Sequence, residues 1–334
     1  MATGITAIAA SRAEMAAVSW ALFQITKIAY VVLWLLTLAR LIRYRPYLIQ
    51  DLTSAARSPG FLTMVAATCV LGSEYVLLAK DRGTADLLWV LGAVLWVGLL
   101  YTLFTAATVR GPKPAIEDCL DGTWLMPVVA TQSVSLLAAL VAPAWGPRQS
   151  LVLFLAMALC LLGCSFYVPI IVMIGYRLLF RPVTPAGFTP SYWIAMGALA
   201  ISTLAGTVLV AAAPHAAILN DALPGLKILT LALWTAATWW IPVLVILGVW
   251  RHVARGRVPL AYGPAYWSMI FPLGMYASCT FGITPITGET PFRALACVFL
   301  YAALTAWVWA FAGLLRGLVE LALPPGCDGK RRPL

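Results

Sequence analysis

Few residues in this sequence have the types and spacing that covalent or metal chemistry requires. Its two histidines, His215 and His252, lie far apart, and its seven cysteines include no CxxC pair. The sequence has no HExxH motif, no paired-Asp pattern of the prenyltransferase kind and no GxxxxGK[ST] phosphate loop. Haem, zinc and phosphoryl chemistry therefore lack the residues they need. We expect no catalytic residue, no bound metal and no cofactor, and hence no enzyme.

Two ionisable residues are exceptional because they lie within apolar runs. Charge at membrane depth is costly and often functional. For Lys27 one interpretation is a charge that attracts anions or pairs with Glu74 or Glu14, and the other is a side chain that snorkels to the interface. Glu74 stands toward the outer end of its apolar run, where we expect it at the vestibule of a passage.

The composition indicates that lipid is the main solvent of this chain. Of its 334 residues, 62% are hydrophobic and 10% are charged, whereas soluble domains have about 45–50% and about 25%. This excludes a secreted or cytosolic enzyme, a disordered region and a nucleic-acid module. The formal net charge of +10 is explained by the positive-inside bias of membrane proteins. The sequence therefore predicts an all-α polytopic membrane protein whose first partner is the bilayer.

Apolar runs long enough to cross about 30 Å of hydrocarbon recur along the chain. Each is expected to be helical, because unpaired backbone amides are too costly in lipid. Nine full spans are predicted: Val18–Leu38, Phe61–Leu78, Leu87–Val109, Trp124–Ala142, Leu151–Tyr176, Tyr192–Ala213, Leu226–Trp250, Trp267–Ile283 and Arg293–Leu318. A shorter run, Met1–Ala10, predicts a truncated first helix, which makes ten.

The positive charges predict the orientation. Fifteen lysines and arginines follow even-numbered spans, namely Arg40, Arg43, Arg45, Arg57, Arg110, Lys113, Arg177, Arg181, Arg251, Arg255, Arg257, Arg316, Lys330, Arg331 and Arg332. Six lie on the other side: Arg12, Lys80, Arg82, Arg148, Lys227 and Arg293. By the positive-inside rule both termini are cytoplasmic, in a multi-pass protein of the plasma (inner) membrane. We divide the chain into one transmembrane transport domain, 1–322, and a short basic cytoplasmic tail, 323–334.

Four spans begin with an aromatic residue and a similar apolar pattern, at Phe61, Trp124, Trp193 and Trp267. The intervals between these residues each hold one helical hairpin, and Met1–Ile5 supplies a fifth copy of the pattern. Parallel repeats of this kind are related by an axis along the membrane normal. The sequence therefore predicts five helical hairpins around a central pore.

Small and weakly polar residues concentrate on the odd-numbered helices, which we place inside, with the bulkier even helices outside against lipid. The residues expected to line the pore or kink its helices are Thr68, Pro127, Thr131, Gln132, Gly197, Pro272 and Gly274. A proline inside a helix removes a backbone hydrogen bond and kinks it. The alternative interpretation is that these residues only allow tight helix packing.

The segment Phe271-Pro-Leu-Gly-Met-Tyr-Ala277, preceded by Tyr266-Trp-Ser268, resembles the ninth-helix signature of the tellurite-resistance/C4-dicarboxylate transporter family. This family includes bacterial tellurite-resistance proteins, fungal malate and sulfite carriers, and plant slow-type anion channels. Trp124–Gln132, Tyr192–Gly206, Trp250–His252 and Met1–Ile5 are also similar to its blocks. The resemblance implies ten helices with the odd ones inside, a homotrimer, and a central anion pore closed by a phenylalanine, here Phe271.

The predicted function is transport of small anions, such as C4-dicarboxylates, sulfite, chloride or nitrate, through a pore gated by Phe271. Pro272 and Gly274 leave room for its ring to move, and an apolar ring in a narrow bore blocks ions by size and by dewetting. The residues leave a channel and a proton-coupled carrier as alternatives. An intramembrane enzyme and a membrane scaffold without transport are the other function classes.

Overall fold

The computed structural model describes residues 1–111, 113–254, 258–288 and 291–322, which form helices and no strands. Arg255, Arg257, Cys327 and the basic tail fall outside this part of the chain. The long elements of the described part are α1 (Ala2–Arg12), α2 (Ala16–Arg43), α4 (Thr63–Glu74), α5 (Arg82–Val109), α7 (Met126–Val141), α8 (Gln149–Phe180), α9 (Ile194–Ala212), α11 (Leu223–Val253), α12 (Trp267–Thr287) and α13 (Pro291–Ala322).

Within the described residues, eight segments are long and apolar enough to cross a membrane. One of them, Gly122–Phe180, has 59 residues and contains both α7 and α8. The chain turns between these two helices at Gly146, whose φ of 48° and ψ of −118° are not helical. Helix α1 has 11 residues, so it spans only about 16 Å, half of the hydrocarbon thickness. The short first helix is as predicted, and the number of ten crossing helices stays a prediction.

Several short elements were not predicted. They are α3 (Arg45–Leu52), α6 (Ile116–Cys119) and α10 (Ala217–Asp221). In addition, one turn of 3₁₀ helix precedes α4, α7, α9 and α12, at Ser58–Leu62, Gly122–Leu125, Pro190–Trp193 and Pro264–Tyr266. The four repeats recognised in the sequence therefore share the same entry into their first helix.

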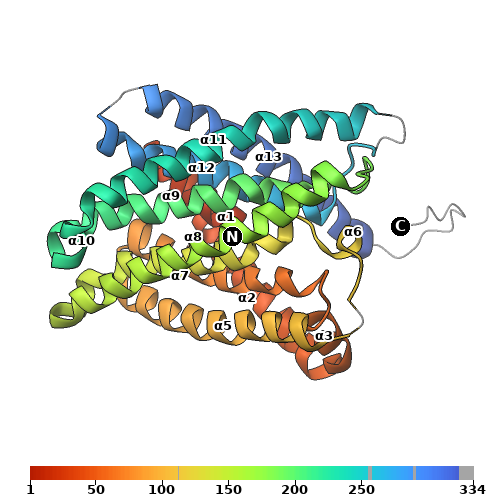
Figure 1. Ribbon diagram of the computed structural model, residues 1–334, viewed down its shortest axis with the longest axis horizontal. Helices are drawn as coiled ribbons and strands as arrows, with labels where there is room; N and C mark the ends of the chain where they lie inside the picture. The colour runs from red at the N-terminus through yellow and green to blue at the C-terminus, as the bar shows by residue number, and fades with distance from the viewer. Residues whose placement is uncertain (112, 255–257, 289–290, 323–334) are drawn as a thin grey trace, which may run out of the picture.

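The helices are paired as five hairpins, α1–α2, α4–α5, α7–α8, α9–α11 and α12–α13, whose members pack against each other. The first helices of the hairpins also contact one another in the closed order α1, α4, α7, α9, α12 and back to α1. In Figure 1 all hairpins point the same way, with α3 and α6 at one end of the bundle and α10 at the other. We call the end with α3 and α6 the basic end.

Burial follows this division, as predicted. Of the inner helices, α7 buries every residue except Leu140. The outer helices bury one narrow stripe and leave the rest of their surface to lipid. On α13 the stripe consists of Ala296, Leu300, Ala303, Trp307 and Ala310, alternating steps of four and three that keep one face toward the ring. The first helix of each hairpin is inside and the second is outside.

The kink predicted at Pro127 is wrong. Helix α7 begins at Met126, and Pro127 stands in its first turn. The backbone N–H groups of a first turn have no acceptor within the helix, so a proline there breaks no hydrogen bond. Pro272, by contrast, lies inside α12.

The hairpins are joined by a hydrogen bond that recurs around the ring. In each case an aromatic side chain of an outer helix bonds to the inner helix of the next hairpin. The five pairs are Tyr30 with Thr68 (2.9 Å), Trp96 with Thr131 (2.8 Å), Tyr167 with the carbonyl of Ala195 (3.2 Å), Trp234 with Thr280 (3.0 Å) and Trp307 with Thr3 (3.0 Å). The fifth pair runs from α13 back to α1 and closes the ring.

We predict that Trp96→Phe destabilises the protein, because it removes the indole N–H that bonds to Thr131 while keeping an aromatic ring. Hydrogen bonds between membrane helices contribute about 0.6 and at most about 1.7 kcal/mol, so the free energy of unfolding should fall by that amount. Thermal unfolding followed by circular dichroism measures it. The control is Trp239→Phe on α11, whose side chain is 63% exposed. Equal unfolding midpoints for the two variants would contradict a role for the bond.

Candidate functional site

The ring of inner helices is the candidate site. Phe271 on α12 is the residue whose position in the ring matters most for a gate. The Phe271 side chain is 1% exposed on α12. The next residue, Pro272, meets α9, because a Cβ on Gly197 would stand 2.7 Å from Pro272 Cγ. Gly274 meets α1, because a Cβ there would stand 3.0 Å from Thr6 Oγ1. These two residues mark the sides of α12 that face its neighbours in the ring.

The outer side of α12 is marked by Tyr276, whose ring centroid lies 4.5 Å from that of Phe299 on α13. Residues that follow each other on a helix are turned by about 100°. Phe271 and Met275 therefore share the remaining side of α12, which lies opposite α13 and between the sides that face α9 and α1. This side is directed at the axis of the ring, and both side chains are buried there.

Arg12 is a charged residue of the ring that the sequence analysis counted only as a loop residue. It is the last residue of α1, and its Nη1 donates to the Ser278 carbonyl on α12 at 3.2 Å. A Cβ on Gly282 would stand 3.1 Å from this nitrogen and 2.8 Å from Thr207 Oγ1 on α9. The guanidinium thus lies among three inner helices, at the end opposite the basic end. Among the described residues, no ion pair includes Arg12.

The sequence predicted that Glu74 lies at the vestibule of a passage. The structure does not place it at an open vestibule. It is fully buried on α4, where a Cβ on Gly4 of α1 would stand 2.5 Å from its Oε2. The glycine allows α1 to cover the carboxyl group. Within the described chain, neither oxygen has a hydrogen-bond partner of ordinary geometry. The groups that interact with the carboxyl group electrostatically are the Met1 amino group and, on α2, Thr26 and Lys27.

Lys27 makes no ion pair with either carboxylate proposed for it, so far as the described residues go. Its Nζ lies 4.8 Å from the centroid of the Phe23 ring, which is a cation–π arrangement. Glu14 instead accepts a hydrogen bond from Arg293 at 2.9 Å. Lys27 therefore forms no direct ion pair among the described residues, and it interacts with Glu74 only through the longer-range field.

Three polar residues expected to line the pore face the outer helices instead. Thr68 and Thr131 bond to the aromatic side chains of α2 and α5 described above. Gln132 donates from Nε2 to the Cys160 carbonyl on α8 at 2.9 Å. A polar side chain in a membrane protein lowers its energy by forming a hydrogen bond with a neighbouring helix. These three residues therefore join helices. The pore-lining prediction for them is corrected.

The sequence contains a signal for this arrangement that the residue types alone did not reveal. Tyr30, Trp96, Tyr167, Trp234 and Trp307 occur once per hairpin, always on the outer helix. A search for aromatic residues repeated with the hairpin period would have found the joining bonds. Arg12 has a similar signal, because it follows a short apolar run that contains no proline.

Comparison with known proteins agrees with this architecture. The family model described as voltage-dependent anion channel matches residues 1–315. An uncharacterized membrane protein of Mycobacterium tuberculosis is 36% identical over 154 residues, which cover 46% of this chain and 76% of that protein. Two uncharacterized transporters of Methanocaldococcus jannaschii are 22% identical over 276 and 254 residues, which cover 81% and 75% of this chain and 77% and 69% of theirs.

The family match extends over nearly all of the described chain, including every helix of the inner ring. It also agrees with the sequence resemblance, since the tellurite-resistance/dicarboxylate transporters are grouped in the same family. The chain belongs to the voltage-dependent anion channel family, a family of membrane transporters and channels.

Proposed function

We propose that this protein conducts small anions along the axis of the inner ring and that Phe271 closes the passage. The observation that carries the proposal is the side of α12 on which Phe271 and Met275 lie, opposite the outer helix α13. An apolar ring at this position excludes hydrated ions by size and by dewetting. Membership in a family of anion channels supports the same function.

Arg12 supports the choice of anions over cations. Its guanidinium stands among inner helices and has no carboxylate partner among the residues described. A lone cation at one end of a narrow passage attracts anions and repels cations. One fixed charge favours weak binding, which conduction requires. We therefore favour a channel for small anions over a carrier that binds a dianion tightly.

The finer assignments rest on the sequence alone. We propose the plasma membrane, cytoplasmic termini and a homotrimer for this protein, with one transport domain over 1–322 followed by the tail. Chloride, nitrate, sulfite and C4-dicarboxylates are the candidate anions, and a role in tellurite resistance follows only from the family resemblance.

We expect Phe271→Ala to raise anion flux several-fold in reconstituted vesicles, because the substitution removes the ring that blocks the bore. Chloride or nitrate efflux measures the rate. Phe23→Ala is the matched control, since it deletes an equally buried ring, 1% exposed, from the outer helix α2. Unchanged flux in a folded Phe271→Ala protein would argue against the gate.

We expect Arg12→Gln to lower anion flux by about tenfold at low ionic strength and by less at high salt, because salt screens the attraction. Arg12→Lys keeps the charge and should keep most of the flux. Arg148→Gln removes an exposed cation at the same end of the bundle and serves as the control. Equal loss in Arg148→Gln, or a loss independent of salt, would exclude Arg12 as the attracting charge.

One observation favours proton coupling as a second candidate mechanism, namely the buried carboxyl group of Glu74 without a hydrogen-bond partner in the described chain. Proton relays in membrane transporters use such groups. For a channel, we expect no accumulation of anion driven by a pH gradient, in the wild type or in Glu74→Gln. Accumulation by the wild type that is abolished in Glu74→Gln would establish coupling instead.

A further inference from the structure

A polar cavity of about 580 Å³ lies at the basic end, outside the inner ring. Its walls are the end of α3, the loop that follows it, the last turn of α5 and the segment after α5. The residues with which it can bind a ligand are Thr53, Ser54, Arg57, Arg110 and Lys113. The transport function proposed above uses none of them.

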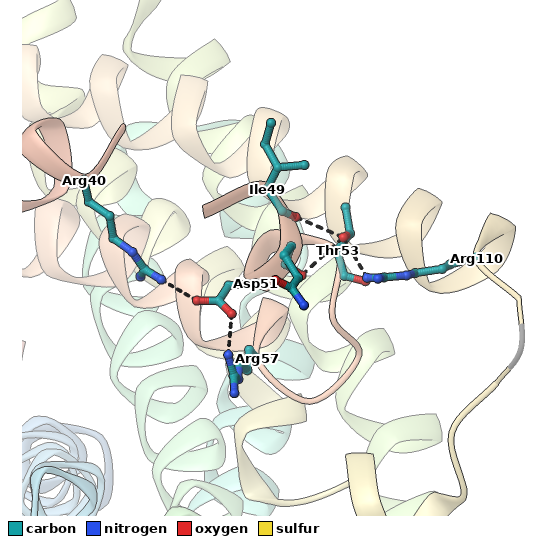
Figure 2. A network of polar contacts seen from close by, with 7 residues as sticks. Arg40, Ile49, Asp51, Thr53, Arg57 and Arg110 are labelled. Carbon is teal, nitrogen blue, oxygen red and sulfur yellow. Dashed lines mark hydrogen bonds and ion pairs between the residues drawn. The ribbon is translucent and has the colours of Figure 1, made fainter. Parts of the chain in front are cut away.

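The cavity carries an excess of positive charge. Arg57, Arg110 and Lys113 contribute three cations and Asp51 one carboxylate, which leaves a formal charge of 3 − 1 = +2. Asp51 is already engaged, since Arg57 Nη1 lies 2.6 Å from its Oδ1 and Arg40 contacts its Oδ2 (Figure 2). The wall therefore suits an anion. The Asp51 carboxylate is neutralised by its ion pairs with Arg40 and Arg57.

Hydrogen bonds hold the cavity in shape. Arg110 Nη1 donates to both the carbonyl and the hydroxyl oxygen of Thr53 (Figure 2). Both distances are 2.8 Å. Lys113 Nζ donates to the Thr108 carbonyl at 2.8 Å and also contacts the Ala107 carbonyl. The Arg110 bonds tie the loop after α3 to the end of α5, and the Lys113 bonds hold the following segment against that end. A site whose donors are already positioned loses less entropy when a ligand binds.

The place of the cavity suits the phosphate level of a bilayer. Helix α3 buries no residue, and its Tyr47 and Ile49 are 64% and 49% exposed. It continues from the end of α2, whose Val31, Leu33, Leu35 and Leu36 are exposed as on a surface covered by acyl chains. Tyrosine is enriched at the membrane interface. Basic sites at this level, next to membrane helices, attract anionic headgroups.

We propose that this cavity is a binding site for a phosphate group, which Arg57, Arg110 and Lys113 recognise. The guanidinium groups of arginine match two phosphate oxygens at once, and the lysine adds a point charge. The phosphate is carried by an anionic lipid headgroup or is free in solution. Both sources present the same oxygens to the same three cations.

The test measures ligands retained by the purified full-length protein in native mass spectrometry. The probes are phosphatidylglycerol, phosphatidylcholine at the same concentration, and inorganic phosphate. The double variant Arg110→Gln/Lys113→Gln removes two cations. Ala107→Phe keeps every charge and fills part of the space. Arg43→Gln is the control, because it removes a cation from the end of α2 outside the cavity.

We expect the wild type to retain phosphatidylglycerol over phosphatidylcholine. Each removed cation should weaken retention by about fivefold, and Ala107→Phe should also weaken it, while Arg43→Gln should not. Circular dichroism and gel filtration confirm that each variant is folded. If inorganic phosphate displaces the lipid, the site is assigned to free phosphate. If inorganic phosphate does not displace the lipid, the site is assigned to the lipid headgroup. Equal retention of both lipids with no binding of phosphate, or equal loss in Arg43→Gln, would overturn the proposal.

Discussion

The hydrogen bond from an outer aromatic residue to the next inner helix is the interaction on which this structure depends. Lipid surrounds the bundle, so helices gain little hydrophobic free energy by leaving it for one another. Close packing and buried hydrogen bonds must hold the ring instead. Each of the five bonds joins two hairpins rather than two helices of one hairpin. Because the last bond returns from α13 to α1, the five bonds form a closed series around the ring.

The sequence predicted the order of the long helices, their pairing and the division into inner and outer helices. These features follow from hydropathy, hairpin length and the concentration of small residues. Each of these signals is averaged over a whole helix, so a single residue changes it little. It did not predict α3, α6 or α10, which are short and lie at the ends of the bundle. It also misplaced the effect of Pro127, because a boundary shift of a few residues moves a proline from a helix interior to a first turn.

The individual side chains were harder to predict than the helices. Thr68, Thr131 and Gln132 lie on inner helices as expected, yet they face outward to α2, α5 and α8. Residue type does not tell which side of a helix a polar group takes, because a hydroxyl lowers its energy equally well by bonding to a neighbouring helix. Arg12 was overlooked because its position in the sequence suggested a loop rather than the inner ring. A charge at the end of a short run resembles a loop residue until α12 and α9 are placed beside it.

Arg12 and Glu74, two ionisable residues of the inner ring, must be considered together. Gly4, which covers Glu74, and Arg12 lie eight residues apart on α1, or about 12 Å along its axis. The residues of α1 between them, Ile5–Ala10, are buried, so the fields of Arg12 and Glu74 are less screened by salt than those of surface charges. When Glu74 is ionised it cancels part of the attraction that Arg12 exerts on an anion. When it is protonated, the field of Arg12 acts alone. In the passage that we propose, the electrostatics therefore depend on one carboxyl group that the passing anion need not touch.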